Sequence, residues 1–214
     1  MLNYRLLQQL APLNFRDERK TESLPDYLER VSPLVPFIPQ NVLTQWIYRH
    51  WRGFESNWSF IDLARHQFEC EQWPTERIIA QTGSRHMEVI ERWGEMLRSN
   101  RYVRRSWLGE DMLSRGTWSE PIIVLAPEPG GHYPDGQPLP QPYCLLEGHH
   151  RLGYLRSMAA DGAPLQLPYR KRRKFGPPSQ DNSPKRHSIR KLPTFPAYIP
   201  ALLSALMVGR GFSN

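Results

Sequence analysis

The sequence has few cysteines and no long apolar run. Its two cysteines, Cys70 and Cys144, can form at most one disulfide, so reduced thiols are the simpler interpretation. The longest apolar stretch near the end covers residues 198–208 and contains Pro200 and Ser204, whereas a membrane-spanning helix needs about 20 residues. No apolar signal core follows Met1. We therefore expect a cytoplasmic protein with no membrane partner.

Several catalytic signatures are also missing. The sequence contains no GxxxxGK[ST] loop and no GxSxG elbow, which excludes a P-loop protein and a serine hydrolase of the elbow type. His132, Cys144, His149 and His150 were weighed as zinc ligands, but no two of them share a spacing typical of zinc sites. The sequence therefore predicts no metal site.

Proline and the aromatic residues, in contrast, are plentiful. The 21 prolines among 214 residues are about twice the usual share of ~5% and exclude long helical bundles and regular repeats. Seven Trp, nine Tyr and eight Phe supply large side chains for a packed core.

The net charge of +7 belongs to one segment. Between residues 168 and 191 there are nine Lys and Arg residues and a single Asp, so the rest of the chain is close to neutral. A basic tail of this kind binds nucleic-acid phosphates without sequence preference, so DNA is a candidate partner. A solvated tail with no partner is the alternative.

Composition divides the chain into four segments. We expect an N-terminal extension at 1–40, a helical region at 41–102, a core domain at 103–167 and a basic, proline-rich tail at 168–214 that is poorly ordered. Prolines 33, 36 and 39 favour an extended path. Apolar spacing predicts helices over 41–54, 59–68, from 75 and over 87–97. Residues 75–97 fit either a helix-turn-helix or, as we prefer, two packed core helices.

The core domain has an alternating order of elements. The short run at 121–125 is rich in β-branched residues, which predicts a strand. Six prolines and three glycines in 126–142 predict a long loop. A second strand at 143–146 and a helix ending at Asp161-Gly162 complete a strand–loop–strand–turn–helix unit. The predicted fold class is α/β or α+β.

The turn between the second strand and that helix, Glu147–Arg151, carries most of the chemistry. Gly148 permits an unusual φ or a close backbone approach by a ligand. The first N–H groups of a helix are unpaired and carry partial positive charge. With His149, His150 and Arg151 beside them, they predict an anion site, phosphate above all. Glu147 is placed to orient a histidine, a hydroxyl or a metal-bound water.

The run Tyr143–Leu152, preceded by Gly116–Leu125, resembles the signature of the ParB/sulfiredoxin superfamily. The resemblance covers about residues 103–162 and implies a ParB/sulfiredoxin-like core. It also implies that the turn binds nucleotide phosphates, so we expect ATP, ADP or CTP, with Mg²⁺, held by Gly148, His149, His150 and Arg151. Sulfiredoxins place a nucleophilic Cys after the glycine, where this sequence has His149, so sulfinic-acid reduction is not expected.

The resemblance to individual branches points to two functions. The Glu-Gly-His-His-Arg form is similar to a ParB-like branch that includes free amino-acid kinases, which implies catalytic roles for Glu147, His149 and His150. Glu110, Asp111 and Glu120 are the candidates for a separate base. The Trp-rich N-terminal half is similar to the IbrB-like branch of gene-expression co-activators.

Two hypotheses therefore stay open. The first is a nucleotide-dependent phosphotransferase or hydrolase that uses the Glu147–Arg151 turn. The second is a non-enzymatic, DNA-associated regulator that uses the same site as a ligand switch and the basic tail or residues 75–97 on DNA. Under both hypotheses we expect Arg151 to be accessible to solvent and to bind a phosphate.

Overall fold

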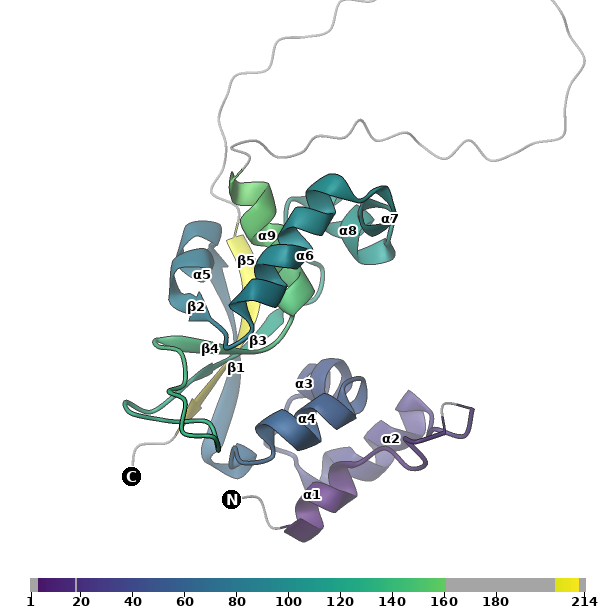
Figure 1. Ribbon diagram of the computed structural model, residues 1–214. Coiled ribbons are helices and arrows are strands. Elements are labelled where there is room, and N and C mark those ends of the chain that lie inside the picture. Colours follow the sequence, from purple (N-terminus) through teal and green to yellow (C-terminus); the bar gives the residue numbers. More distant parts are fainter. Residues whose placement is uncertain (1–3, 18, 161–202, 212–214) are drawn as a thin grey trace, which may run out of the picture.

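A computed structural model describes residues 4–17, 19–160 and 203–211. These residues form a mixed α/β fold around a five-stranded sheet with the order β1-β5-β3-β4-β2 (Figure 1). The strands are β1 His66–Pro74, β2 Thr82–Gly83, β3 Ile122–Ala126, β4 Tyr143–Glu147 and β5 Leu203–Gly211. Within the described residues no helix is long and apolar enough to cross a bilayer.

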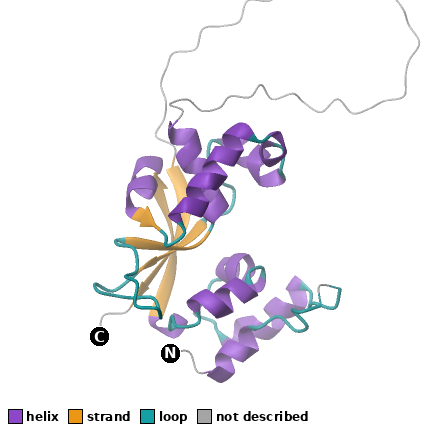
Figure 2. Cartoon of the chain, viewed as in Figure 1, coloured by secondary structure: helices purple, strands orange, loops and turns teal. Residues whose placement is uncertain are grey.

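Helices cover both faces of the sheet (Figure 2). The N-terminal layer consists of α1 Tyr4–Leu10, α2 Leu24–Val31, η1 Ser32–Leu34, α3 Gln40–Val42, η2 Leu43–Tyr48, α4 Trp51–Trp58 and η3 Leu63–Arg65. The second layer consists of α5 Thr75–Gln81, α6 Met87–Ser99, α7 Arg101–Arg104, α8 Trp107–Arg115 and α9 His149–Ala160.

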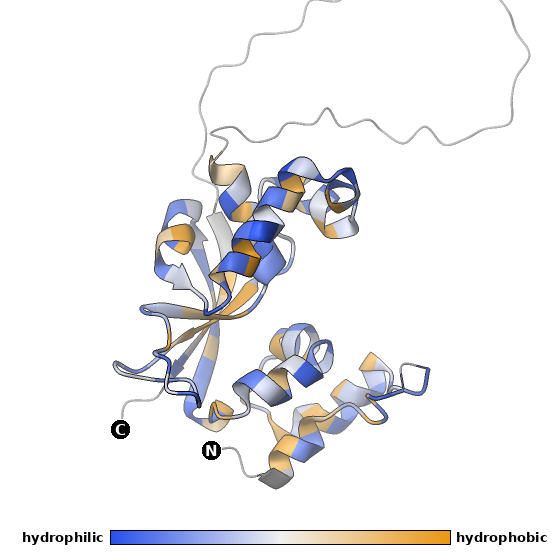
Figure 3. Cartoon of the chain, in the orientation of Figure 1, coloured by the Kyte–Doolittle hydropathy of each residue, from blue (hydrophilic) through white to orange (hydrophobic). Residues whose placement is uncertain are grey.

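The alternation of side chains along the central strands divides the core in two. On β3, Ile123 and Leu125 join the N-terminal helices, while Ile122 and Val124 join the layer of α5, α6, α8 and α9. Successive strand residues point to opposite faces, so β3 is buried on both sides. Figure 3 shows the resulting apolar strands between helices with polar outer faces.

The predicted strand–loop–strand–turn–helix unit is confirmed. β3 and β4 pair antiparallel, and α9 follows at once. Helix α9 packs against α6 so closely that a Cβ on Gly94 would lie 2.7 Å from the carbonyl oxygen of Gly153. Two glycines therefore let the helix behind the turn pack closely against α6.

Two secondary-structure predictions are wrong. The helix expected over 59–68 is η3 followed by β1, because pairing along all nine residues of β5 outweighs a local apolar spacing. The extended path expected at the three prolines is interrupted by η1, and Val35 and Ile38 are buried in the first core. The segment before residue 40 is therefore packed against the rest of the chain.

The helix-turn-helix interpretation of 75–97 is also wrong. Residues 82–83 between α5 and α6 form β2, which pairs parallel with β4, so a strand of the sheet separates the two helices. Ile78, Ile90 and Leu97 are buried in the second core. The preferred interpretation, two packed core helices, is confirmed.

The tail needs a partial correction. Residues 203–211 were expected to be poorly ordered, but they form β5 between β1 and β3. Leu206 and Val208 are fully buried, which is why this apolar stretch belongs to the sheet. The basic cluster between 168 and 191 lies outside the described residues.

Candidate functional site

Gly148 lies between the end of β4 and the start of α9, with a φ of +106°. L-residues rarely adopt this conformation. A Cβ at this position would lie 2.6 Å from Cγ2 of Ile122, on the neighbouring strand. The glycine is therefore required by the turn and by the side chain of β3, and this packing explains it without a ligand.

Arg151 is buried, with 8% of its surface exposed. Its guanidinium donates to Gln45 Oε1 at 2.9 Å and to the Glu120 carbonyl at 3.1 Å, and it forms an ion pair with Glu147. The expectation that Arg151 is accessible is wrong. Glu147 at the end of β4 and Gln45 from the N-terminal layer enclose it, so the arginine joins the two layers.

The Glu147 carboxylate contacts two basic side chains. One carboxylate oxygen pairs with Arg151, and the other lies 3.7 Å from Nε2 of His50. The side chain therefore holds Arg151 in place.

His149 is partly buried. Its Nε2 lies 3.3 Å from Ser84 Oγ, and its ring faces that of His86 at 5.9 Å. Burial, followed by the charges of His86, His150 and His50, lowers the pKa of His149 to about 4. At neutral pH the ring is therefore an uncharged hydrogen-bonding group.

His150 is exposed and packs on aromatic side chains. Its ring centroid lies 3.7 Å from that of Trp93, and it stacks with Tyr154 at 6.4 Å. Burial of part of the ring, together with the charges of His50 and Arg151, lowers the pKa of His150. The ring therefore packs between Trp93 and Tyr154 at the first turn of α9.

The low pKa of His149 predicts acid sensitivity. The unfolded chain binds more protons than the folded chain between about pH 4 and the ordinary value of 6.5, so stability falls as the pH falls through this window. At about 1.4 kcal/mol per unit, His149→Gln should gain up to about 3 kcal/mol relative to the wild type between pH 7 and pH 4. Urea unfolding at several pH values measures this gain. Parallel pH profiles of the two proteins would contradict the predicted pKa.

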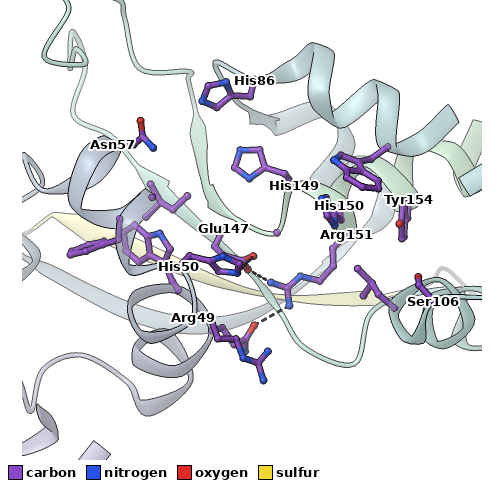
Figure 4. Close-up of a pocket in the computed structure, with 18 of the residues that line it drawn as sticks. Arg49, His50, Asn57, His86, Ser106, Glu147, His149, His150, Arg151 and Tyr154 are labelled. Atoms are coloured by element: carbon purple, nitrogen blue, oxygen red, sulfur yellow. Dashed lines mark hydrogen bonds and ion pairs between the residues drawn. The ribbon is translucent and has the colours of Figure 1, made fainter. Parts of the chain in front are cut away.

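A cavity of about 710 Å³ opens at this turn (Figure 4). The N-terminal layer, β4, α9 and the segment from α6 to α8 all contribute to its wall. Among the described residues, its lining includes His50, His86, His149 and His150, the two arginines Arg49 and Arg151, and the aromatic residues Trp46, Phe54, Trp58, Trp93, Tyr102, Trp107 and Tyr154. The turn residues predicted from the sequence are therefore brought together, in a cationic and aromatic cavity.

The sequence analysis missed Arg49 and His50. Both residues lie on the N-terminal layer, are exposed and line the cavity. Arg49 makes no hydrogen bond or ion pair with the described residues, in contrast to Arg151. A basic pair between apolar helical residues was the signal that could have drawn attention to them.

The three candidate bases lie outside the cavity lining. Glu110 is exposed on α8, Asp111 pairs with Arg115, and Glu120 accepts a hydrogen bond from Gln45. None of them is placed to serve a ligand in the cavity.

The zinc interpretation gains no support. No group of three metal-binding side chains occurs in the described part of the chain. Cys144 is buried beside Tyr133, with 3.3 Å between sulfur and hydroxyl oxygen, and burial raises its pKa to about 11. Cys70 and Cys144 are both free thiols.

Comparisons with models of known families, with curated proteins and with solved structures give no match. The resemblance to the ParB/sulfiredoxin superfamily therefore stays a prediction.

Proposed function

We propose that the chain is a nucleotide-binding protein that holds the phosphates of its ligand in the cavity at the start of α9. The observation that carries the proposal is that this helix start lies in one cavity with several imidazoles and with Arg49, which has no hydrogen-bond or ion-pair partner among the described residues. Helix N-termini favour anions because their first N–H groups are unpaired and the helix dipole is positive there.

The charge at the site favours a phosphate. Arg151 is neutralised by Glu147, so among the described residues of the lining Arg49 is the arginine without an ion-pair partner. His149 is uncharged at pH 7 and contributes hydrogen bonds. Arginine binds phosphate through two parallel bonds, so Arg49 replaces Arg151 in the role that the sequence suggested.

The aromatic lining favours a planar group beside the phosphate. The ring of Trp93 lies along His150 at the first turn of α9, and the cavity volume of about 710 Å³ is within the range of small-molecule sites. A nucleotide such as ATP, ADP or CTP joins a phosphate and a planar base in one ligand.

The lining does not fit a protein-bound Mg²⁺. The metal prefers carboxylate oxygens, and Glu147, the one acidic residue of the lining within the described chain, is paired with Arg151. We derive no phosphoryl-transfer step. Of the two hypotheses, ligand binding by a regulatory protein has the better support, and the phosphotransferase or hydrolase stays a prediction.

Arg49→Ala should separate binding from folding. We expect nucleotide affinity to fall about tenfold to hundredfold, because a hydrogen bond to a charged group contributes roughly 1.5–3 kcal/mol. Stability should change by less than about 0.5 kcal/mol, since the side chain is exposed. Calorimetric titration with ATP, ADP, CTP and GTP, alongside adenosine and cytidine, measures the affinities.

The matched control is Arg52→Ala on α4, an exposed arginine outside the lining, which should leave affinity unchanged. Nucleosides that bind as tightly as nucleotides would overturn the proposal. Equal losses in the two variants would show a general charge effect, which would also overturn it.

A further inference from the structure

Two aromatic side chains beside the cavity are unusually exposed. Tyr102 on α7 has 71% of its surface exposed and Trp107 at the start of α8 has 67%. They are the most exposed of the large hydrophobic side chains in the described residues. The other six tryptophans are buried or half-buried, so packing within the chain does not account for Trp107.

Arginines flank these two rings in the sequence. Residues 95–111 contain Arg98, Arg101, Arg104 and Arg105 together with Glu95, Glu110 and Asp111, and Asp111 is paired with Arg115. In the described chain, Arg101, Arg104 and Arg105 form no ion pair, and the Arg101 guanidinium lies 4.9 Å from the ring of Tyr102 and donates to its hydroxyl. The surface therefore combines three arginines that have no ion-pair partner among the described residues with two exposed aromatic rings.

The backbone under this surface is fixed by caps. Asn100 Oδ1 accepts from the N–H of Tyr102 at 2.9 Å, and Ser106 Oγ accepts from the N–H of Gly109 at 3.1 Å. A Cβ on Gly109 would lie 3.0 Å from the carbonyl oxygen of Arg104, so the two helices meet closely at this glycine. A preformed surface loses little entropy on binding.

We propose that α7 and the start of α8 bind single-stranded nucleic acid. Bases stack on Tyr102 and Trp107, and Arg101, Arg104 and Arg105 contact the backbone phosphates. Stacking requires unpaired bases, which distinguishes single strands from duplexes, and it is tolerant of sequence because every base has an aromatic face. An acidic peptide would satisfy the arginines but would leave the two rings without a function.

This inference goes beyond the proposed function and stands without it. Tyr102 and Trp107 also lie on the rim of the cavity, but their exposed faces are available to a strand that never enters it. The two proposals therefore fail separately. Oligonucleotide binding without mononucleotide binding overturns the proposed function alone, and the reverse result overturns this inference alone.

Fluorescence anisotropy of the full chain with labelled (dT)15 and (rU)15 tests the inference. Each of Tyr102→Ala and Trp107→Ala should weaken binding about five- to hundredfold, while Trp107→Phe keeps most of the affinity. Replacing Arg101, Arg104 and Arg105 by Gln should reduce the slope of log K against log salt by about 2, at roughly 0.7 per phosphate contact. Thermal unfolding checks that each variant is folded.

Two matched controls separate the effect of this surface from the effect of basic residues elsewhere in the chain. Replacing Arg16, Arg19 and Lys20 by Gln removes three exposed charges from the N-terminal layer and should leave the affinity unchanged. A chain with Gln at 170–174 removes the main basic cluster, and the losses from Tyr102→Ala and Trp107→Ala should be the same in it. Wild-type affinity in the aromatic variants, tighter binding of a 15-base-pair duplex, or equal binding of polyglutamate would each overturn the inference.

Discussion

Replacing Arg151 with alanine is expected to lower the free energy of unfolding by about 3–5 kcal/mol, the usual cost of removing one partner from a buried ion pair. The guanidinium satisfies the Glu147 carboxylate, the Gln45 side chain and the Glu120 carbonyl together. Because Gln45 is 4% exposed, water does not easily replace these bonds. The sequence alone suggested little effect on folding, and the buried position reverses that expectation.

Urea unfolding of three variants tests the role of Arg151. Arg49→Ala, the exposed arginine of the same cavity, should unfold like the wild type. Glu147→Gln added to Arg151→Ala should recover part of the lost stability, because it removes the unpaired carboxylate charge. A single Arg151→Ala variant with wild-type stability would show that the ion pair does not join the two layers.

Gly148→Ala is expected to cost about 2–6 kcal/mol. Backbone strain of roughly 1–3 kcal/mol arises because φ is +106°, and a similar cost arises because the new Cβ would lie 2.6 Å from Ile122 Cγ2. Ile122 is fully buried in β3 and has no room to retreat. A loss of this size is a large part of the 5–15 kcal/mol of a typical domain.

Gly130→Ala is the matched control for the strain component alone. Gly130 also has a positive φ, of +77°, but no atom lies within 4 Å of a Cβ built there. Denaturant unfolding should therefore show a clearly smaller loss for Gly130→Ala than for Gly148→Ala. Equal losses would mean that Ile122 gives way and that packing does not require the glycine.

The part of the fold that the sequence predicts correctly is local. The strands at 121–125 and 143–146, and the helix after them, follow from short apolar runs and nearby turn residues. Helices α5 and α6 were predicted for the same reason. Each of these elements has a pattern that its own residues display before any tertiary contact forms.

The elements that were missed depend on distant partners. β1 is a strand because β5 pairs with it from about 140 residues away along the chain. Arg151 is buried because Gln45, 106 residues earlier, closes over it. No local pattern contains either contact, so the sequence suggested a helix in the first case and an exposed ligand in the second.

The candidate site was located correctly but its residues were only partly assigned. His149 and His150 do face the cavity, whereas Gly148 and the Glu147–Arg151 pair have structural roles. Arg49 was missed because it lies in the turn between η2 and α4, two elements whose local signal is apolar spacing. The N-terminal layer, which carries Arg49, meets the Glu147–Arg151 turn at the cavity. Arg49 therefore lies outside the sequence motif that predicted the site.

The most direct test of the nucleotide site is the backbone amide spectrum of the ¹⁵N-labelled chain during titration with ATP or CTP. The proposal predicts that the amides of His149, His150 and Arg151 shift most, since they form the first turn of α9, and that adenosine or cytidine leaves them nearly unchanged. Largest shifts at any other part of the chain, or equal shifts with the nucleosides, would contradict phosphate binding at this turn.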